Sequence, residues 1–289
     1  MSLLSQKVIP RTKPLKYLIC IPCVNREEKN VKNVIQFTFK SFEEGGLFKS
    51  KVQWEMCLFE SGSKSTSYLH FINEYRDKYP HIKIHILESD IPLDGFTNTH
   101  RMFVHLSKMF EKKKKVKMEN EKEVVKEENG KEIKIDHHFD FVVWMDDDVL
   151  VCRKFLENLD AWIRLFGNSS IFTSLYVCYP SFKLQNTHLA NYAHIYNYFG
   201  TCCTIFRPFL CKFIVPKFFD FPGKPDSKFR YSVQHFFPQQ NKIIVGSGSL
   251  VQHMNAGSVN HQGNKHYTGH RANNFVGIKN DPKLYISFK

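Results

Sequence analysis

The stretch FVVWMDDD, residues 141–148, decides the fold, because an apolar run passes directly into three aspartates. Such a run predicts a buried strand that delivers Asp146, Asp147 and Asp148 to its carboxyl end. Three adjacent carboxylates repel one another and are stable either in open solvent or around a cation. The carboxyl ends of strands form the ligand-binding edge of open α/β sheets. The stretch therefore predicts a cation site at a sheet edge; the alternative is that Asp148 caps a helix beginning near Lys154.

Segments with strand and helix patterns alternate along the chain, which is the organisation of a parallel sheet covered by helices. We therefore expect an α/β fold in which a mixed, mostly parallel sheet is flanked by helices. The expected strands are residues 16–23, 52–59, 81–87, 141–145, 170–178, 201–206 and 242–245. The expected helices are residues 27–43, 66–79, 96–110 and 155–166.

A single domain is expected over all 289 residues, since neither an internal repeat nor a clear linker divides the chain. Residues 111–135 form a tract of lysine and glutamate with almost no apolar content. This charged insertion predicts either a solvated helical hairpin or a disordered surface segment.

The net charge of +13 points to an anionic partner, and the hydrophobic fraction of 42% indicates a globular chain. The lysines are spread along the chain, so we expect no specific nucleic-acid partner; for the cluster at residues 112–115 a nuclear-localisation signal is the alternative. No apolar run is long enough for a signal peptide or a transmembrane segment. We expect a cytoplasmic protein, or one in the secretory-pathway lumen if the sequence is a piece of a longer chain.

Eight cysteines lie mostly in apolar segments, which predicts buried thiols in a reducing compartment. Cys20 and Cys23 form a C-x-x-C pattern, for which a redox pair is the alternative. No second C-x-x-C completes a zinc site.

Oxygen ligands from the three aspartates favour Mn2+ or Mg2+ over zinc and leave coordination positions for phosphate oxygens. The sequence contains neither G-x-x-x-x-G-K-[ST] nor G-x-G-x-x-G, the two common phosphate-binding loops. Phosphate binding is therefore expected to depend on the metal, which would act as a Lewis acid on a diphosphate leaving group.

Four motifs, taken in their order along the chain, resemble the GT-A glycosyltransferases. They are IPCVNR at residues 21–26, ESGS at residues 60–63, a helix carrying Asn98 and Arg101, and WMDDD at residues 144–148. The resemblance covers residues 16–260. It implies a glycosyltransferase whose D-x-D carboxylates hold Mn2+ or Mg2+ on a nucleotide-sugar diphosphate, with residues 16–150 binding the donor and residues 151–274 facing the acceptor.

Within this resemblance, Asp146 and Asp148 fall on the outer D-x-D positions and would bind the metal, so that Asp146 would also meet the donor. Asp147 would contact the ribose or the sugar. His253, within LVQHMN at residues 250–255, resembles the late third metal ligand of the family. A hydrogen-bonded structural histidine is the alternative, and the irregular spacing of the later histidines does not make a zinc site.

The resemblance also assigns the first nucleotide-facing loop and its neighbours. Pro22, Asn25 and Arg26 lie on that loop. Glu60 would accept a hydrogen bond from the base, which suits a UDP-sugar. Arg101 would meet a phosphate; an exposed helical arginine is the alternative.

The acceptor half resembles the family through GTCCTIFR at residues 200–207 and through KPD at residues 224–226. Asp226 would be the catalytic base of an inverting enzyme and would take the proton of an acceptor hydroxyl; a turn aspartate after proline is the alternative. The order of D-D-D, K-P-D and V-Q-H-M is most similar to the N-acetylglucosaminyltransferase IV group, which implies N-acetylglucosamine as the sugar. The acceptor, whether glycan, protein or small molecule, and the oligomeric state stay open.

Three other functions account for parts of the pattern. A HAD-type phosphatase uses D-x-D after its first strand, whereas three expected strands precede the aspartates here. A GT-A-like nucleotidyltransferase needs a glycine-rich first loop, which residues 21–26 lack. A non-enzymatic basic binding module accounts for the charge and leaves the aspartates unexplained.

Overall fold

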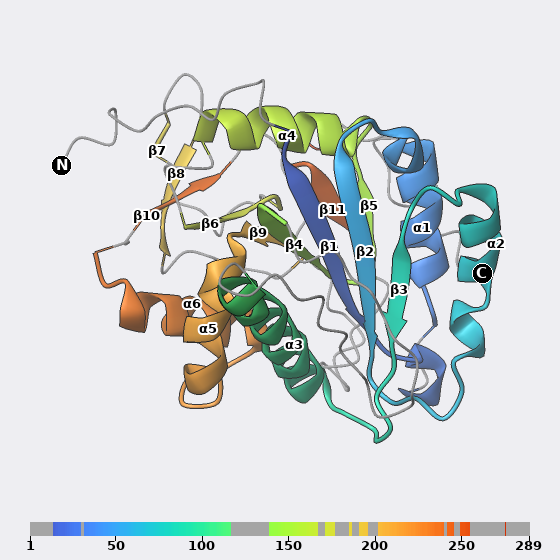
Figure 1. Ribbon diagram of the computed structural model, residues 1–289, viewed down its shortest axis with the longest axis horizontal. Coiled ribbons are helices and arrows are strands. Elements are labelled where there is room, and N and C mark those ends of the chain that lie inside the picture. Colours follow the sequence, from blue (N-terminus) through green and yellow to red (C-terminus); the bar gives the residue numbers. More distant parts are fainter. Residues whose placement is uncertain are drawn as a thin grey trace.

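A six-stranded mixed sheet forms the centre of the computed structural model (Figure 1). The structure describes residues 14–29, 32–116, 139–166, 171–176, 185–186, 191–195, 202–239, 242–245, 249–254 and 275. The strands of the sheet, in spatial order, are β3 (Ile84–Leu87), β2 (Gln53–Glu60), β1 (Lys16–Cys23), β4 (Phe141–Met145), β9 (Cys203–Phe206) and β6 (Phe172–Ser174). Neighbours from β3 to β4 are parallel, whereas β9 is antiparallel to both β4 and β6. The expected mixed, mostly parallel sheet flanked by helices is confirmed.

Helices cover both faces of this sheet (Figure 1). They are α1 (Ile35–Glu44), α2 (Phe71–Lys78), α3 (Gly95–Val116), α4 (Phe155–Phe166), α5 (Cys211–Ile214) and α6 (Pro225–Phe236). Short 3-10 helices are η2 (Arg26–Lys29), η3 (Leu47–Lys49), η4 (Ser67–Leu69), η6 (Pro208–Leu210) and η7 (Val215–Lys217). Two smaller sheets consist of β10 (Lys242–Val245), β8 (Asn191–His194) and β7 (Gln185–Asn186), and of β11 (Val251–His253) and β5 (Val149–Val151). Within the described ranges, no helix is both long and apolar enough to cross a membrane.

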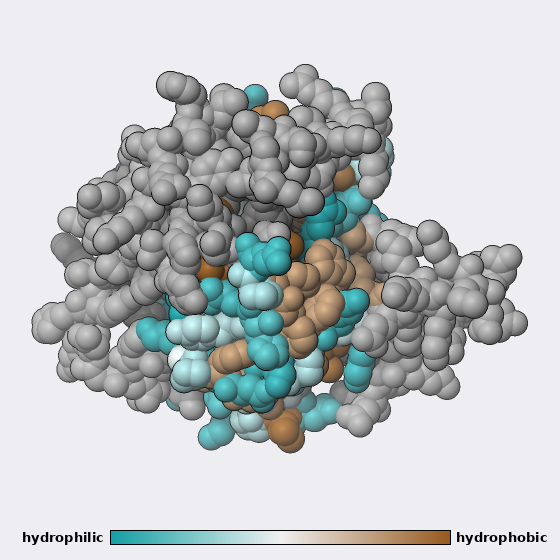
Figure 2. Space-filling model, turned by 90° about the vertical axis from the view of Figure 1, so that its left-hand side faces the viewer, coloured by the Kyte–Doolittle hydropathy of each residue, from teal (hydrophilic) through white to brown (hydrophobic). Residues whose placement is uncertain are grey.

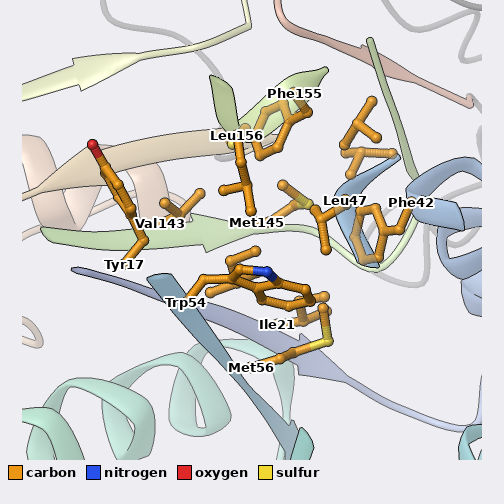
Figure 3. Close-up of a cluster of buried hydrophobic side chains, with 14 of the residues drawn as sticks. Tyr17, Ile21, Phe42, Leu47, Trp54, Met56, Val143, Met145, Phe155 and Leu156 are labelled. Carbon is orange, nitrogen blue, oxygen red and sulfur yellow. The ribbon is translucent and has the colours of Figure 1, made fainter. Parts of the chain in front are cut away.

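The first hydrophobic cluster packs α1, α2 and α4 against one face of the sheet. Figure 3 shows Val143 and Met145 of β4 with Ile21 of β1, close to Phe42 of α1 and Leu156 of α4. Residues two apart on a strand point to the same face, so the apolar run before the aspartates contributes alternate side chains to this core. Burying each such side chain stabilises the fold by about 1.5–3 kcal/mol. The strand that carries the aspartates is thereby fixed in the middle of the sheet.

The second hydrophobic cluster lies on the opposite face and is rich in aromatic rings. Trp144 of β4 meets Phe103 of α3 and Phe229 of α6 edge-on, with ring centroids 5.3 and 5.8 Å apart. Phe206 of β9 contacts both phenylalanines. Each aromatic pair of this kind adds about 0.5–1.5 kcal/mol beyond its buried area. Phe229 therefore fixes α6, the helix that carries Asp226, to the sheet.

The helix expected at residues 27–43 begins only at Ile35, so that prediction is wrong over its first turns. Asn33 gives the physical reason. Its side chain accepts a hydrogen bond from the Arg26 N–H at 2.8 Å and donates one to Asn25 Oδ1 at 2.9 Å. Asparagine side chains that bind nearby polar groups in this way compete with helical hydrogen bonds. The chain forms η2 at Arg26–Lys29 instead, and residues 32–34 are not helical.

Other boundaries differ by smaller amounts. The strand expected at residues 81–87 is shorter, because the Ile82 N–H donates to the Tyr79 carbonyl at 3.0 Å in a turn that precedes β3. Helix α3 runs on to Val116, past the expected end at residue 110, since lysine and glutamate favour helix. The remainder of the charged insertion and the outer ends of the strands expected at 170–178 and 201–206 lie outside the described residues.

The seven described cysteines are all buried and form no disulfide with one another. Cys20 and Cys23 belong to the second and the first cluster respectively, so they point to opposite faces of β1. Burial raises the pKa of both thiols. The redox-pair alternative is therefore wrong, and the prediction of buried thiols is confirmed for the described residues.

Aromatic side chains reach the surface around α5 and α6. Figure 2 looks onto the side of the molecule that lies at the left of Figure 1, and hydrophobic residues gather there among hydrophilic ones. Among the described residues, Phe209, Phe219 and Phe236 are 41%, 53% and 37% exposed. The Phe236 ring lies 5.2 Å from that of Phe213, so these rings partly cover one another.

Candidate functional site

The three aspartates form the turn between β4 and β5, and β5 pairs antiparallel with β11. In this pair His253 lies opposite Val149, and the Met254 N–H donates to the Asp148 carbonyl at 2.9 Å. The late histidine is thus brought back to the aspartates by a strand pair. Strand β5 was not among the expected elements. The helix-capping alternative is wrong, because Asp148 leads into a strand and α4 begins only at Phe155.

Arg26 is the positive centre of this turn. Its Nε donates to Asp147 Oδ2 at 3.2 Å, and its Nη2 pairs with Asp147 Oδ1 and, at 3.1 Å, with Asp148 Oδ2. The three residues are 7%, 7% and 3% exposed, in the order Arg26, Asp147 and Asp148. The Thr38 hydroxyl of α1 also donates to the Asp147 carbonyl at 2.8 Å. Arg26, Asp147 and Asp148 therefore form one buried ion-pair cluster.

The two buried carboxylates differ in how readily they ionise. Burial by itself would raise the pKa of Asp148, but the charges and hydrogen bonds of His253 and Arg26 outweigh it and hold that pKa well below its usual range. Burial raises the pKa of Asp147 above its usual value, although Arg26 opposes the shift. Asp148 is thus the carboxylate that stays charged most firmly.

Asp146, Cys202 and His253 bring one ligand atom each to within 4.8 Å of one another. The Asp146 N–H donates to the Cys202 carbonyl at 3.2 Å, which extends the antiparallel pairing of Met145 with Cys203 by one residue. The structure thus unites Asp146 with His253, as expected for two metal ligands. Asp148 lies behind this group, with Oδ1 3.2 Å from His253 Nε2 and Oδ2 against Arg26.

This set of side chains fits a divalent cation. Carboxylate, thiolate and imidazole are all metal ligands, and three protein ligands leave positions open for a further molecule. With all three aspartates ionised, Arg26 offsets one of three negative charges, so the turn keeps two. A divalent cation would balance them. Cys202 was not foreseen, because only the register of β9 against β4 places it opposite Asp146.

Glu60 ends β2 and is fully buried within the loop that follows it. Its carboxylate accepts hydrogen bonds from the Gly62 N–H at 2.7 Å, from the N–H and hydroxyl of Ser63, and from the Tyr68 hydroxyl at 3.2 Å. The structure therefore places Glu60 where it shapes the loop. Its predicted contact with a nucleotide base stays a prediction.

Gly62 is the position of this loop that accepts glycine alone. Its φ is +78°, and an added Cβ would lie 2.1 Å from the Ile91 carbonyl oxygen. Gly62→Ala is expected to lower the free energy of unfolding by more than about 2 kcal/mol, since the clash adds to the conformational cost of about 1–2 kcal/mol. Gly46 is the control, because it has a φ of +79° with open space around it, and Gly46→Ala should show the conformational cost alone. Equal losses for the two variants in urea unfolding would contradict the close approach.

Arg101 of α3 ties together the ends of two strands. Its Nη1 donates to the Glu60 carbonyl at 2.7 Å, and its Nη2 donates to the Leu87 and Glu88 carbonyls at 2.8 Å each. Asn98, one turn earlier, donates to the Phe59 carbonyl at 2.7 Å. The structure thus shows Arg101 holding backbone at the edge of the sheet, while its predicted contact with a phosphate stays a prediction.

The first loop is connected to the loop after β2 through Asn25. Its N–H donates to Ser63 Oγ at 2.9 Å, and its side-chain amide donates to the Ser65 carbonyl at 3.2 Å. Pro22 lies just before, at the end of β1 and opposite Phe59 of β2. Both residues therefore sit at the carboxyl edge of the sheet, as predicted for strands that end side by side.

Asp226 lies in the first turn of α6, directly after Pro225, and its Oδ1 accepts a hydrogen bond from the Ser227 N–H at 2.8 Å. Acidic residues are favourable at this end of a helix. The structure does not bring Asp226 into the group of Asp146, Cys202 and His253. Its role as the base stays a prediction.

Comparisons with known proteins find likeness in structure alone. No protein-family model and no curated protein sequence matches the chain. S. aureus TarS 1-349 has a TM-score of 0.47 and 15% identity over 82% of this chain and 60% of that one; a complex of it with UDP is also similar. The mannosyltransferase PcManGT of Pyrobaculum calidifontis, in complex with GDP-Man and Mn2+, has a TM-score of 0.46 and 10% identity over 85% of this chain and 61% of that one. The galactosyltransferase LgtC, in complex with donor and acceptor sugar analogs, has a TM-score of 0.40 and 11% identity over 75% of this chain and 70% of that one.

The chain thus spans about 60% of the length of TarS 1-349. With identities of 10–15% and TM-scores below 0.5, these likenesses say nothing about the chemistry of this chain. What the site can do follows from its own residues.

Proposed function

We propose that the chain is a metal-dependent glycosyltransferase that moves a sugar from a nucleotide donor to an acceptor hydroxyl. The observation that carries the proposal is the meeting of Asp146 and His253, from distant parts of the chain, at the carboxyl end of β4. Strands β1 and β2 end at the same edge. Ligands of open α/β sheets bind at such an edge.

The cation, when bound, supplies charge neutralisation for a diphosphate leaving group, which a chain without a glycine-rich phosphate loop needs. Arg26 holds Asp147 and Asp148 in place on one side of the turn. Asp147 would contact a ribose or a sugar only if it gave up its ion pair with Arg26. We therefore assign Asp147 mainly to stabilising the conformation of the turn. Glu60 and Asn25 shape the two loops that would receive the nucleotide.

The finer part of the proposal concerns donor and stereochemistry. A UDP-sugar is supported by Glu60 at the position where the resemblance places the contact with the base, and N-acetylglucosamine is supported by the order of motifs in the sequence. Asp226, partly exposed in the first turn of α6, would take the proton of the acceptor hydroxyl in an inverting reaction. Arg101, which lies at the ends of the strands that it holds, would meet a phosphate of the donor.

A turnover screen tests this function. The chain is incubated with UDP- and GDP-linked sugars and with Mn2+ or Mg2+, and release of the nucleoside diphosphate is measured. We expect release from at least one donor, dependent on the cation and abolished by a chelator. Cleavage of a generic aryl phosphate with no action on any nucleotide sugar would favour the phosphatase alternative and overturn the proposal.

A further inference from the structure

Cys202 lies beside Asp146 and His253, although no part of its local sequence suggests a metal ligand. It precedes β9, is 7% exposed, and accepts the Asp146 N–H at its carbonyl. Its sulfur belongs to the group whose ligand atoms lie within 4.8 Å of one another. Ligand atoms around one tetrahedral ion are about 3–4 Å apart, given metal–ligand bonds of about 2.0–2.3 Å. Only small side-chain movements therefore separate this group from a closed coordination shell.

We propose that Cys202 is a thiolate ligand, so that the cation is held by the Asp146 carboxylate, the Cys202 sulfur and the His253 imidazole. The proposal rests on the proposed function, because it concerns the cation of the same site. Cys202 releases its proton to solvent when it binds the ion. Thiolate favours softer ions, so Zn2+ or Co2+ should be preferred over Mn2+ and Mg2+ more strongly than in an all-oxygen site.

Asp148 takes a different part in this arrangement from the one its D-x-D position suggests. Its Oδ1 faces His253 Nε2 at 3.2 Å, and its Oδ2 faces Arg26 at 3.1 Å. A carboxylate behind a ligating histidine fixes the ring and makes it a better ligand. With Nε2 turned to the carboxylate, the ring presents Nδ1 to the ion. Asp148 is thus a positioning residue, and Arg26 positions Asp148 in turn.

Cobalt spectroscopy on the full, metal-free chain tests the ligand directly. Titration with Co2+ is expected to produce a sulfur-to-cobalt charge-transfer band in the near ultraviolet. Cys202→Ser should lose that band and show a Co2+ affinity at least about 10-fold lower relative to its Mn2+ affinity. Cys211→Ser is the matched control, because Cys211 is buried in the second cluster on the other face of the sheet and should leave the band unchanged.

If Cys202→Ser does not fold, Cys202→Ala takes its place, and the wild-type spectrum decides the matter by itself only when it lacks the band. A wild-type Co2+ complex without a charge-transfer band overturns the proposal, and so does a folded Cys202→Ser that keeps the band. Failure of the proposed function has a different signature: the band is present, but no nucleotide sugar binds or turns over with any cation. An active enzyme whose Co2+ form lacks the band would leave the function standing and remove Cys202 from the ligand set.

Discussion

Arg26→Leu is expected to lower the free energy of unfolding by about 3–5 kcal/mol, because it leaves two buried carboxylates without their cationic partner. Arg26 pairs with Asp147 through two nitrogens and with Asp148 at 3.1 Å, and all three residues are buried. Breaking a buried pair on one side is costly because the remaining charge is neither solvated nor paired. Urea unfolding followed by circular dichroism measures the loss as a lower midpoint.

The control for Arg26→Leu is an exposed ion pair. Lys217 pairs with Asp220 at 2.7 Å, with side chains 36% and 51% exposed, so Lys217→Met should cost less than about 1 kcal/mol. Adding Asp147→Asn to Arg26→Leu should recover part of the lost stability, because it removes one of the two carboxylates that Arg26→Leu leaves unpaired. Equal costs for Arg26→Leu and Lys217→Met would show that the cluster does not hold the turn together.

Asp146→Asn is expected to weaken cation binding by at least about 100-fold. Loss of a residue that only supports a metal ligand weakens binding by about 10–100-fold, and loss of a direct ligand should cost at least as much. Asp146 is the most exposed of the three aspartates and belongs to the group of three potential ligands, whereas Asp147 and Asp148 are held by Arg26. An amide keeps the shape of the side chain but loses the charge that attracts the ion. Equilibrium dialysis with Mn2+ and with Co2+ measures the change.

Asp140→Asn serves as the control at the other end of the same strand. Asp140 directly precedes β4, and its Oδ2 accepts a hydrogen bond from the Lys16 N–H at 3.1 Å. This variant should bind the cation as the wild type does. Unchanged affinity in Asp146→Asn would remove this residue from the site, whereas an equal loss in both variants would indicate a general effect on the fold.

Local sequence patterns account for much of the fold. β1, β4 and α4 begin and end at the predicted residues, because an apolar run or a helical repeat sets those boundaries by itself. The start of α1 was not predictable in this way. It is displaced because the Asn33 side chain accepts a hydrogen bond from the Arg26 N–H and donates one to the Asn25 side chain, two residues that lie between β1 and α1.

The candidate site was predictable only where the chain carries its own signal. The aspartates and His253 stand at strand ends, and the structure brings Asp146, Asp148 and His253 together. Cys202 depends on the register between β9 and β4, which no local pattern encodes. The ion pair of Arg26 with Asp147 likewise depends on the parallel pairing of β1 with β4, which places the ends of these two strands side by side. The contacts of Cys202 and Arg26 were therefore missed, whereas His253, which the β5–β11 pair brings to the aspartates, was expected from the resemblance.

The central claim is that a nucleotide diphosphate binds at the aspartate turn through a cation, and the melting temperature of the chain tests it most directly. UDP together with Mn2+ or Co2+ should raise that temperature by about 5 °C at 100-fold excess over the dissociation constant. Neither UDP nor the cation alone should reach this value, and Asp146→Asn should abolish the joint effect. A melting temperature that UDP and the cation together leave unchanged, or an equal rise in Asp146→Asn, would contradict the account.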